Sequence, residues 1–295
     1  MDDDYIRKKL KKIELLPTFP NIVREVLNII EDPMSSASDL AKHMDPSMVG
    51  EVLRIANSAY FGTRNFRNIA TMEHAIAVIG YKQLSHIILQ MPFVSMVKGD
   101  DKGFDRDKFI RHSIVCGALS DAISQAAFLG NPNDAYISGI MHDIGIIIIY
   151  RYFKDQWDSI NTLMLDKKLL RIEAEQEVFS VDHGYIGATL LEMWNVPKPI
   201  TDSVMFHHNP EGSEENIENV AVTYLGNAFS NRIDFNSDLV SFVDFMVIHR
   251  DFIEQITRFK QNISSNEEMR IFRKIYDALK GVNNYIEGVI EKDYD

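Results

Sequence analysis

A histidine and an aspartate stand side by side in a strongly apolar part of the sequence. His142 and Asp143 lie within residues 139–145, and four isoleucines, residues 146–149, follow directly. Burying a carboxylate without a partner is costly, so we expect Asp143 to be hydrogen-bonded, ion-paired or bound to a metal. Adjacent histidine and aspartate side chains can give one cation a nitrogen and an oxygen ligand, if further ligands come from elsewhere in the chain. The alternative is that Asp143 orients His142 and that both satisfy neighbouring backbone groups.

Further histidines stand in contexts where they could converge on this pair: His112, His183, His207 and His208. The glycines that follow His183 would allow two helices to approach closely at that point. His207 and His208 are expected at a helix end, where backbone carbonyls favour a cation. The order along the chain is therefore a histidine, a His-Asp pair, a histidine and a pair of histidines.

The single cysteine, Cys116, falls one helical turn after His112. A thiol beside a base could act as a nucleophile. A small buried thiol on a helix is the commoner arrangement, and we expect it here. One cysteine also excludes an intramolecular disulfide framework and favours a reducing cytoplasm.

The elements that must position these residues are expected to be helices, so the predicted fold class is all-α. Glycine and proline are sparse, which disfavours a fold of many short strands. Apolar residues recur at helical spacing through most of the chain. The helices expected on these grounds cover approximately residues 2–16, 22–30, 38–41, 46–61, 71–80, 81–97, 109–129, 132–143, 173–179, 186–194, 200–208, 217–231, 238–263 and 267–290.

Two features of this pattern need comment. The isoleucine run has strand-like propensity, but a lone strand among helices would have no sheet partner, so we expect a buried helix there. Pro92 is expected to kink or end the helix that carries it. The polar, glycine-flanked residues 98–103 are the best candidate for a hinge.

Composition and charge restrict the class of partner. The chain has 295 residues, 45% of them hydrophobic, and a net charge of −12. An acidic protein attracts phosphate backbones weakly, so we expect no nucleic-acid partner and only salt-sensitive DNA binding. No apolar run approaches the roughly 20 residues needed to cross a bilayer. The N-terminus lacks the pattern of a signal peptide, so we expect neither a membrane association nor export from the cytoplasm.

The histidine order resembles that of the metal-dependent HD phosphohydrolase superfamily and its HD-GYP phosphodiesterase branch. Further motifs are similar to those of the HDOD domain, and together they span approximately residues 13–210. These motifs are Leu-Pro-Thr-Phe-Pro at 16–20, Asp-Pro at 45–46, Leu-Arg-Ile-Ala-Asn-Ser-Ala-Tyr-Phe-Gly at 53–62, Ala-Ile-Ala-Val-Ile-Gly at 75–80, Arg-His-Ser at 111–113, residues 139–145 and 182–188, Trp-Asn-Val-Pro at 194–197 and His-His at 207–208.

The HDOD resemblance implies an organisation as well as a role. It implies an N-terminal helical lobe, residues 1–98, packed on an HD-like helical bundle, residues 105–210. A helical C-terminal extension, residues 211–295, would then pack on the HD-like lobe. It also implies a bacterial signalling or regulatory protein, usually without demonstrated catalysis. The candidate metal ligands that it implies are His112, His142, Asp143, His183, His207 and His208.

Two positions depart from the pattern of the active HD enzymes. Those enzymes complete their ligand set with an aspartate on a later helix, where this chain has Asn227, a neutral and weaker ligand. The phosphodiesterase branch has a lysine after its His-Asp-x-Gly, where this chain has Ile146. A site that lacks one anionic ligand and one phosphate-binding cation is poorly suited to phosphoester hydrolysis.

Two functions therefore remain as hypotheses. The first is a non-catalytic signal-transduction module that acts by binding a signalling protein and carries a degenerate HD metal site. The alternative is a metal-dependent phosphohydrolase or phosphodiesterase acting on a nucleotide or cyclic dinucleotide. Asn227 and Ile146 both favour the first, so no catalytic residue is assigned. No cofactor is required by it, although the remaining ligands could still bind manganese, iron or magnesium (Mn, Fe or Mg).

Overall fold

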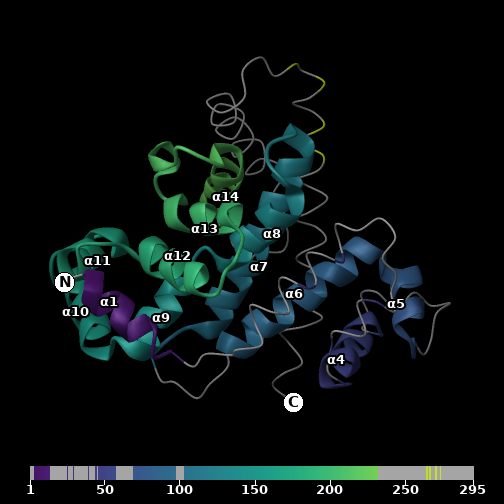
Figure 1. Cartoon of the computed structure of the whole chain (residues 1–295), viewed down its shortest axis with the longest axis horizontal. Helices are drawn as coiled ribbons and strands as arrows, with labels where there is room; N and C mark the ends of the chain where they lie inside the picture. The colour runs from purple at the N-terminus through teal and green to yellow at the C-terminus, as the bar shows by residue number, and fades with distance from the viewer. Residues whose placement is uncertain are drawn as a thin grey trace. The chain divides into compact units, whose positions relative to one another are not determined.

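The computed structural model describes residues 3–13, 46–57, 69–97 and 103–231, together with residues 25, 29, 39, 44, 264, 266, 270 and 273. The elements within these ranges are all helices, which confirms the predicted all-α class (Figure 1). Contacts divide the chain into two units. One, here called the HD unit, contains residues 1–15 and 115–276, and the other contains residues 16–114 and 277–295. None of the helices in the described ranges is long and apolar enough to cross a membrane.

The second unit contains three described helices that contact one another: α4 (Pro46–Ala56), α5 (Met72–Ile79) and α6 (Tyr81–Val97). The ends of α5 lie where the sequence predicted them. The Thr71 side chain caps its N-terminus, and Gly80 ends it with a φ of 92°, a conformation that glycine adopts readily. Pro92 does not end α6, which continues to Val97. The helices expected at residues 22–30, 38–41, 238–263 and 267–290 and the hinge expected at 98–103 lie mostly outside the described residues.

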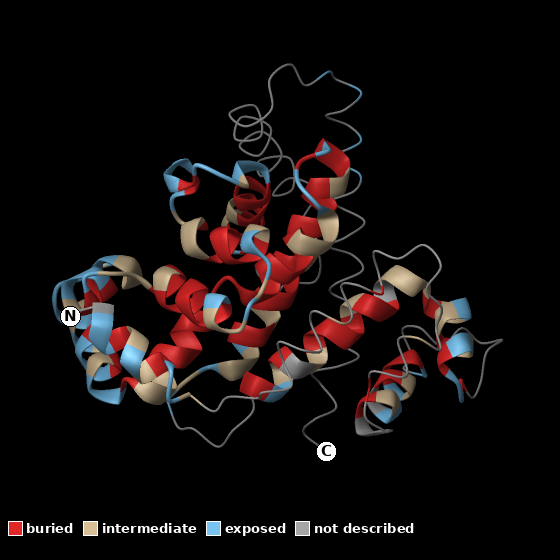
Figure 2. Cartoon of the chain, viewed as in Figure 1, coloured by how far each residue is buried: buried red, intermediate tan, exposed pale blue. Residues whose placement is uncertain are grey.

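The HD unit carries the His-Asp pair. Its helices are α1 (Asp3–Leu10), the greater part of α7 (Arg106–Ala127), α8 (Pro132–Met141), α9 (Ile144–Tyr152), α10 (Lys154–Asp166), α11 (Arg171–Phe179), α12 (His183–Met193), α13 (Lys198–Phe206), the short 3₁₀ helix η1 (Pro210–Gly212) and α14 (Ile217–Ser230). Helix α13 contacts α8, α12 and α14, and α12 also contacts α9. The side chains between these helices are largely buried (Figure 2). The isoleucine run forms α9, as predicted.

The grouping of residues differs from the predicted division in two places. The boundary between the units falls within α7, after Ile114, whereas the sequence placed it between residues 98 and 105. Helix α1 belongs to the HD unit, whereas the sequence assigned it to an N-terminal lobe. It buries Ile6 and Leu10 completely, and the Arg7 guanidinium donates a hydrogen bond of 3.1 Å to the Tyr185 hydroxyl on α12.

Glycines bring the helix ends of the HD unit into direct backbone contact. A Cβ atom on Gly145 of α9 would lie 1.9 Å from the His183 carbonyl oxygen at the start of α12. A Cβ atom on Gly184 would lie 3.0 Å from the carbonyl oxygens of Val204 and Met205 on α13. The expectation that glycines near His183 permit close helix approach is therefore confirmed, and it applies to α9 as well.

We predict that Gly145→Ala destabilises the protein by about 3 kcal/mol or more, because the added methyl group meets a backbone atom that cannot move away freely. Chemical denaturation of the variant measures this loss. The matched control is Gly50→Ala on α4, where a Cβ atom meets nothing within 4 Å and helix propensity favours alanine. A Gly145→Ala variant as stable as the control would contradict the close contact between α9 and α12.

Candidate metal centre

Apart from His112, which lies within α7, the candidate ligands lie at or next to the ends of helices. His142 follows the last residue of α8, and Asp143 immediately precedes α9. His183 is the first residue of α12, and His207 directly follows the last residue of α13. Asp143 is the N-cap residue of α9, where the helix dipole favours a negative charge, although its side chain makes no capping hydrogen bond. The close glycine contacts among α9, α12 and α13 bring these ends together.

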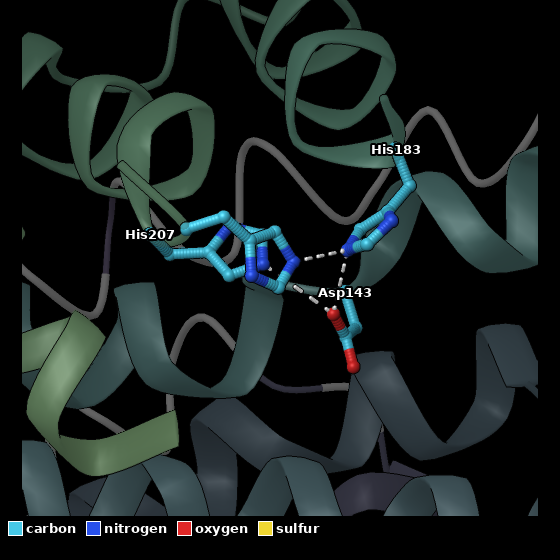
Figure 3. A group of neighbouring side chains, drawn as sticks. Asp143, His183 and His207 are labelled. Carbon is cyan, nitrogen blue, oxygen red and sulfur yellow. Dashed lines mark hydrogen bonds and ion pairs between the residues drawn. The ribbon is translucent and has the colours of Figure 1, made fainter. Parts of the chain in front are cut away.

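The Asp143 carboxylate lies at the centre of the cluster (Figure 3). Its Oδ1 atom lies 3.1 Å from His183 Nε2 and 3.6 Å from His207 Nε2, and its Oδ2 atom lies 3.2 Å from His142 Nε2. His208 Nε2 lies 3.0 Å from His183 Nε2. The Asp143, His183, His207 and His208 side chains each offer a ligand atom, and these atoms lie within 4.8 Å of one another.

The sixth candidate, His112, lies on α7, in the part of that helix that the contacts assign to the other unit. Cys116 is fully buried, as expected for a thiol packed within a helical core. Within the HD unit the structure thus brings together five of the six residues that the sequence named as candidate ligands: His142, Asp143, His183, His207 and His208.

The second ring nitrogens show which atoms are free to bind a metal. His142 Nδ1 lies 2.7 Å from the Gly139 carbonyl oxygen, and His207 Nδ1 lies 2.7 Å from the Val204 carbonyl oxygen. A carbonyl oxygen can only accept, so both Nδ1 atoms must donate. A neutral ring then carries its lone pair on Nε2, the atom that would bind a metal, whereas a protonated ring carries a second N–H there and can donate it to Asp143. His207 Nε2 is buried and has no hydrogen-bond partner.

This donor set suits a transition metal. The group within the HD unit offers three imidazole nitrogens and one carboxylate oxygen. Imidazole is a favourable ligand for zinc, iron, nickel and copper, whereas magnesium prefers oxygen ligands and retains several waters. Of the three metals expected from the sequence, iron fits this group best and magnesium least. A buried nitrogen lone pair without a partner, as on His207, is the feature that such a cation would satisfy.

The comparisons with known proteins agree with this architecture. Residues 16–210 match the model of the HDOD domain. This chain belongs to the HDOD domain family. A curated relative from Treponema pallidum, named only as an uncharacterized protein, is 23% identical over 211 residues, which is 69% of this chain. The HDOD chain spans about 40% of the length of that relative.

Solved structures show the same fold. An HDOD domain protein of unknown function from Geobacter sulfurreducens superimposes with a TM-score of 0.75 at 19% identity, over 98% of this chain and 99% of that one. A candidate phosphohydrolase from Shewanella amazonensis superimposes with a TM-score of 0.72 at 16% identity, over 96% of this chain and 97% of that one. A candidate signal transduction protein from Marinobacter aquaeolei superimposes with a TM-score of 0.59 at 14% identity, over 90% of this chain and 60% of that one. Proteins given different functions thus share the fold of this HDOD chain.

The two departures from the enzyme pattern are both buried. Ile146 is the third residue of α9, and its backbone N–H donates to the Asp143 carbonyl oxygen. The Asn227 side-chain oxygen accepts a hydrogen bond of 2.9 Å from Asn231, one turn further along α14. Sequence reasoning missed Glu175, a fully buried carboxylate on α11 that contacts His183. Its place eight residues before His183 gave no signal, because α11 carries other glutamates that are exposed.

Burial and charge act against each other in the cluster. Burial alone would lower the pKa of His183, but the charge of Glu175 and the hydrogen bonds with Asp143 and Glu175 raise it to about 10. Burial would raise the pKa of Asp143, but the charge of His142 and hydrogen bonds from the surrounding imidazoles hold it well below its usual value. Burial, followed by the charges of His207 and His183, lowers the pKa of His208 to about 2. Metal-free, the centre therefore contains protonated His183 and neutral His208.

We predict that this proton makes the metal-free protein less stable at alkaline pH. His183 titrates at about 10 when folded, against about 6.5 when unfolded, so the folded state binds the extra proton between these values. That contribution to stability is complete below pH 6.5 and is lost as pH rises through 10, with a slope of up to about 1.4 kcal/mol per pH unit. Urea unfolding with a chelator present, at pH 7 to 10, measures the slope. His183→Gln should reduce it, whereas the half-buried control His74→Gln should not, and equal slopes in all three proteins would contradict the assignment.

Proposed function

We propose that this HDOD chain is a regulatory module that acts by binding another protein, and that its HD unit binds a divalent metal without hydrolysing phosphoesters. The observation that carries the proposal is the hydrogen bond between Asn227 and Asn231. It occupies the side-chain oxygen that stands where the active HD enzymes have a ligand aspartate.

The neighbourhood of Asn227 supports this reading. Helix α14 approaches α7 closely at Gly226, where a Cβ atom would lie 2.2 Å from Ser120 Oγ and 3.0 Å from the Cys116 carbonyl oxygen. Asn227, the next residue of α14, is therefore one position from a direct contact with α7. A neutral amide there leaves Asp143 as the only carboxylate in the described ligand group.

Ile146 provides the second support. A phosphoester substrate carries negative charge that an enzyme must stabilise with cations or aligned donors. The buried aliphatic side chain of Ile146 supplies neither one turn beyond Asp143. Binding a phosphate against it would remove charge from water without replacing its solvation.

A metal held by Asp143, His183, His207 and His208 would have a structural effect. These four residues sit at the ends of α9, α12 and α13. A bound divalent cation would supply positive charge to the single carboxylate and would link the three helix ends. The residues themselves orient the lone pairs and exclude water, and the surface formed by these helices is then held in one arrangement for a partner.

The kind of partner follows from charge. The net charge of −12 disfavours nucleic acid, so the proposed partner is a signalling protein. The free, buried Cys116 is compatible with the reducing cytoplasm in which we place this activity.

A phosphohydrolase acting on a nucleotide or cyclic dinucleotide is the second candidate. The observation that favours it is the retained group of Asp143, His183, His207 and His208. Metal binding alone does not distinguish the two functions, because both include it. The rate of phosphoester hydrolysis does distinguish them.

We predict that the protein, supplied with manganese, magnesium or iron, hydrolyses cyclic dinucleotides and common nucleotides far more slowly than the roughly 1 per second of ordinary enzymes. Product analysis by chromatography measures this rate, with Asp143→Ala as the control for contaminating activity. Turnover at enzyme-like rates that Asp143→Ala abolishes would refute the proposal and establish the hydrolase.

We also predict that Asn227→Asp binds manganese or iron more tightly than the natural chain, since affinity for such cations depends on the charge of the ligands. The change is nearly isosteric, and the Asn231 side chain can donate to a carboxylate as it does to the amide. The metal-free variant should be slightly less stable because the new carboxylate repels Asp143. Calorimetric titration measures affinity, and Gln176→Glu, an exposed amide-to-carboxylate change on α11, is the control. Unchanged affinity in a variant that melts normally would show that Asn227 does not occupy the ligand position.

A further inference from the structure

The Nδ1 atom of His183 donates its hydrogen bond to a different kind of acceptor from the Nδ1 atoms of His142 and His207. His142 and His207 each use a neutral backbone carbonyl three residues earlier in their own helical turn. His183 instead uses the carboxylate of Glu175, on a different helix, with Nδ1 2.7 Å from Oε2. Of His142, His183 and His207, His183 is therefore the ring whose Nδ1 atom is held by an anion.

Glu175 is committed to His183 through more than one contact. The same Oε2 atom also accepts the His183 backbone N–H at 2.9 Å. The Glu175 carboxylate thus fixes both the backbone at the start of α12 and the orientation of the His183 ring. Because a carboxylate accepts the Nδ1 proton, the ring presents Nε2 toward Asp143, 3.1 Å away.

The rest of the Glu175 environment leaves its charge poorly compensated. The side chain is fully buried, and Oε1 has no hydrogen-bond partner among the residues that the structure describes. Apart from His183, its ion-pair partner is the Arg171 guanidinium, whose Nη1 atom lies 3.9 Å from Oε1 and whose Cζ atom lies 4.8 Å from the centre of the Trp157 ring. A buried anion kept in this setting needs a positive charge on the His183 side.

We infer that Glu175 is a positioning residue of the metal centre: it orients His183 for coordination through Nε2 and supplies the second negative charge that a divalent cation there requires. This inference rests on the proposed metal binding. Asp143 alone carries one negative charge, and Asn227 adds none. Glu175, joined to the cation through the His183 ring, brings the total to two and makes the imidazole a stronger donor.

The test compares Zn²⁺ affinity in three full-length proteins by calorimetry with a competing chelator. Glu175→Gln keeps the size of the side chain and a carbonyl acceptor but removes the charge. We expect it to fold and to bind Zn²⁺ about 10- to 100-fold more weakly, the loss typical for removing a partner that orients a metal ligand. The matched control is Glu177→Gln, an exposed glutamate on the same helix, which should bind as the natural chain does.

Ring ¹⁵N NMR of the natural chain provides a second measurement that a merely structural role would not affect. We expect the His183 Nδ1 proton to persist when Zn²⁺ is added and the Nε2 resonance to report coordination. Coordination through Nδ1 would overturn the inference, even if Glu175→Gln failed to fold and its affinity could not be measured.

The outcomes separate the inference from the function on which it rests. Equal Zn²⁺ affinity in Glu175→Gln and the natural chain would overturn the role of Glu175 while leaving metal binding intact. No Zn²⁺ binding by the natural chain would overturn both. Weakened binding in Glu175→Gln alone, with coordination through Nε2, supports the inference.

Discussion

The structure of the HD unit depends on the burial of one carboxylate. Asp143 can remain charged inside an apolar core only because imidazole nitrogens surround it and it lies at the N-terminus of α9. This requirement explains why helix ends, rather than helix faces, meet at the centre. Helix ends carry the partly charged backbone groups that such a cluster needs, and the glycines on α9 and α12 let those ends approach to backbone contact. Glycine contacts provide no side-chain packing between these helices, and the interactions of Asp143 stabilise the contacts instead.

Much of this arrangement could be predicted from the sequence, for identifiable reasons. A His-Asp pair in an apolar run has few stable environments, and the remaining histidines fall at positions where a change of helix is signalled by glycine or proline. The start of α8 follows from Asn131 and Pro132, which cap it as their types suggest. The isoleucines of α9 form a helix because surrounding helices bury them, and no neighbouring strand in the described ranges could pair with an extended alternative.

The features that the sequence did not reveal depend on long-range contacts. Helix α10 was not predicted. It buries Trp157 and Ile160, and the sequence does not show which neighbours bury them. Glu175 could not be distinguished from the exposed glutamates beside it, since only the folded chain shows which one faces His183. The grouping of α1 with the HD unit was missed for the same reason. The sequence of this short, charged helix does not indicate which other helices bury Ile6 and Leu10.

The position of α1 also sets an order for folding on the ribosome. Its Arg7 bonds to Tyr185 across 178 residues of sequence, and its Lys9 bonds to the Tyr152 carbonyl across 143. Helix α1 therefore has no docking surface until α9 and α12 have been synthesised. Contacts of such long sequence separation are expensive to close, so they form late in folding. Residues 16–114 are thus synthesised before α1 can dock, and closure of the HD unit joins segments that lie on either side of them in the sequence.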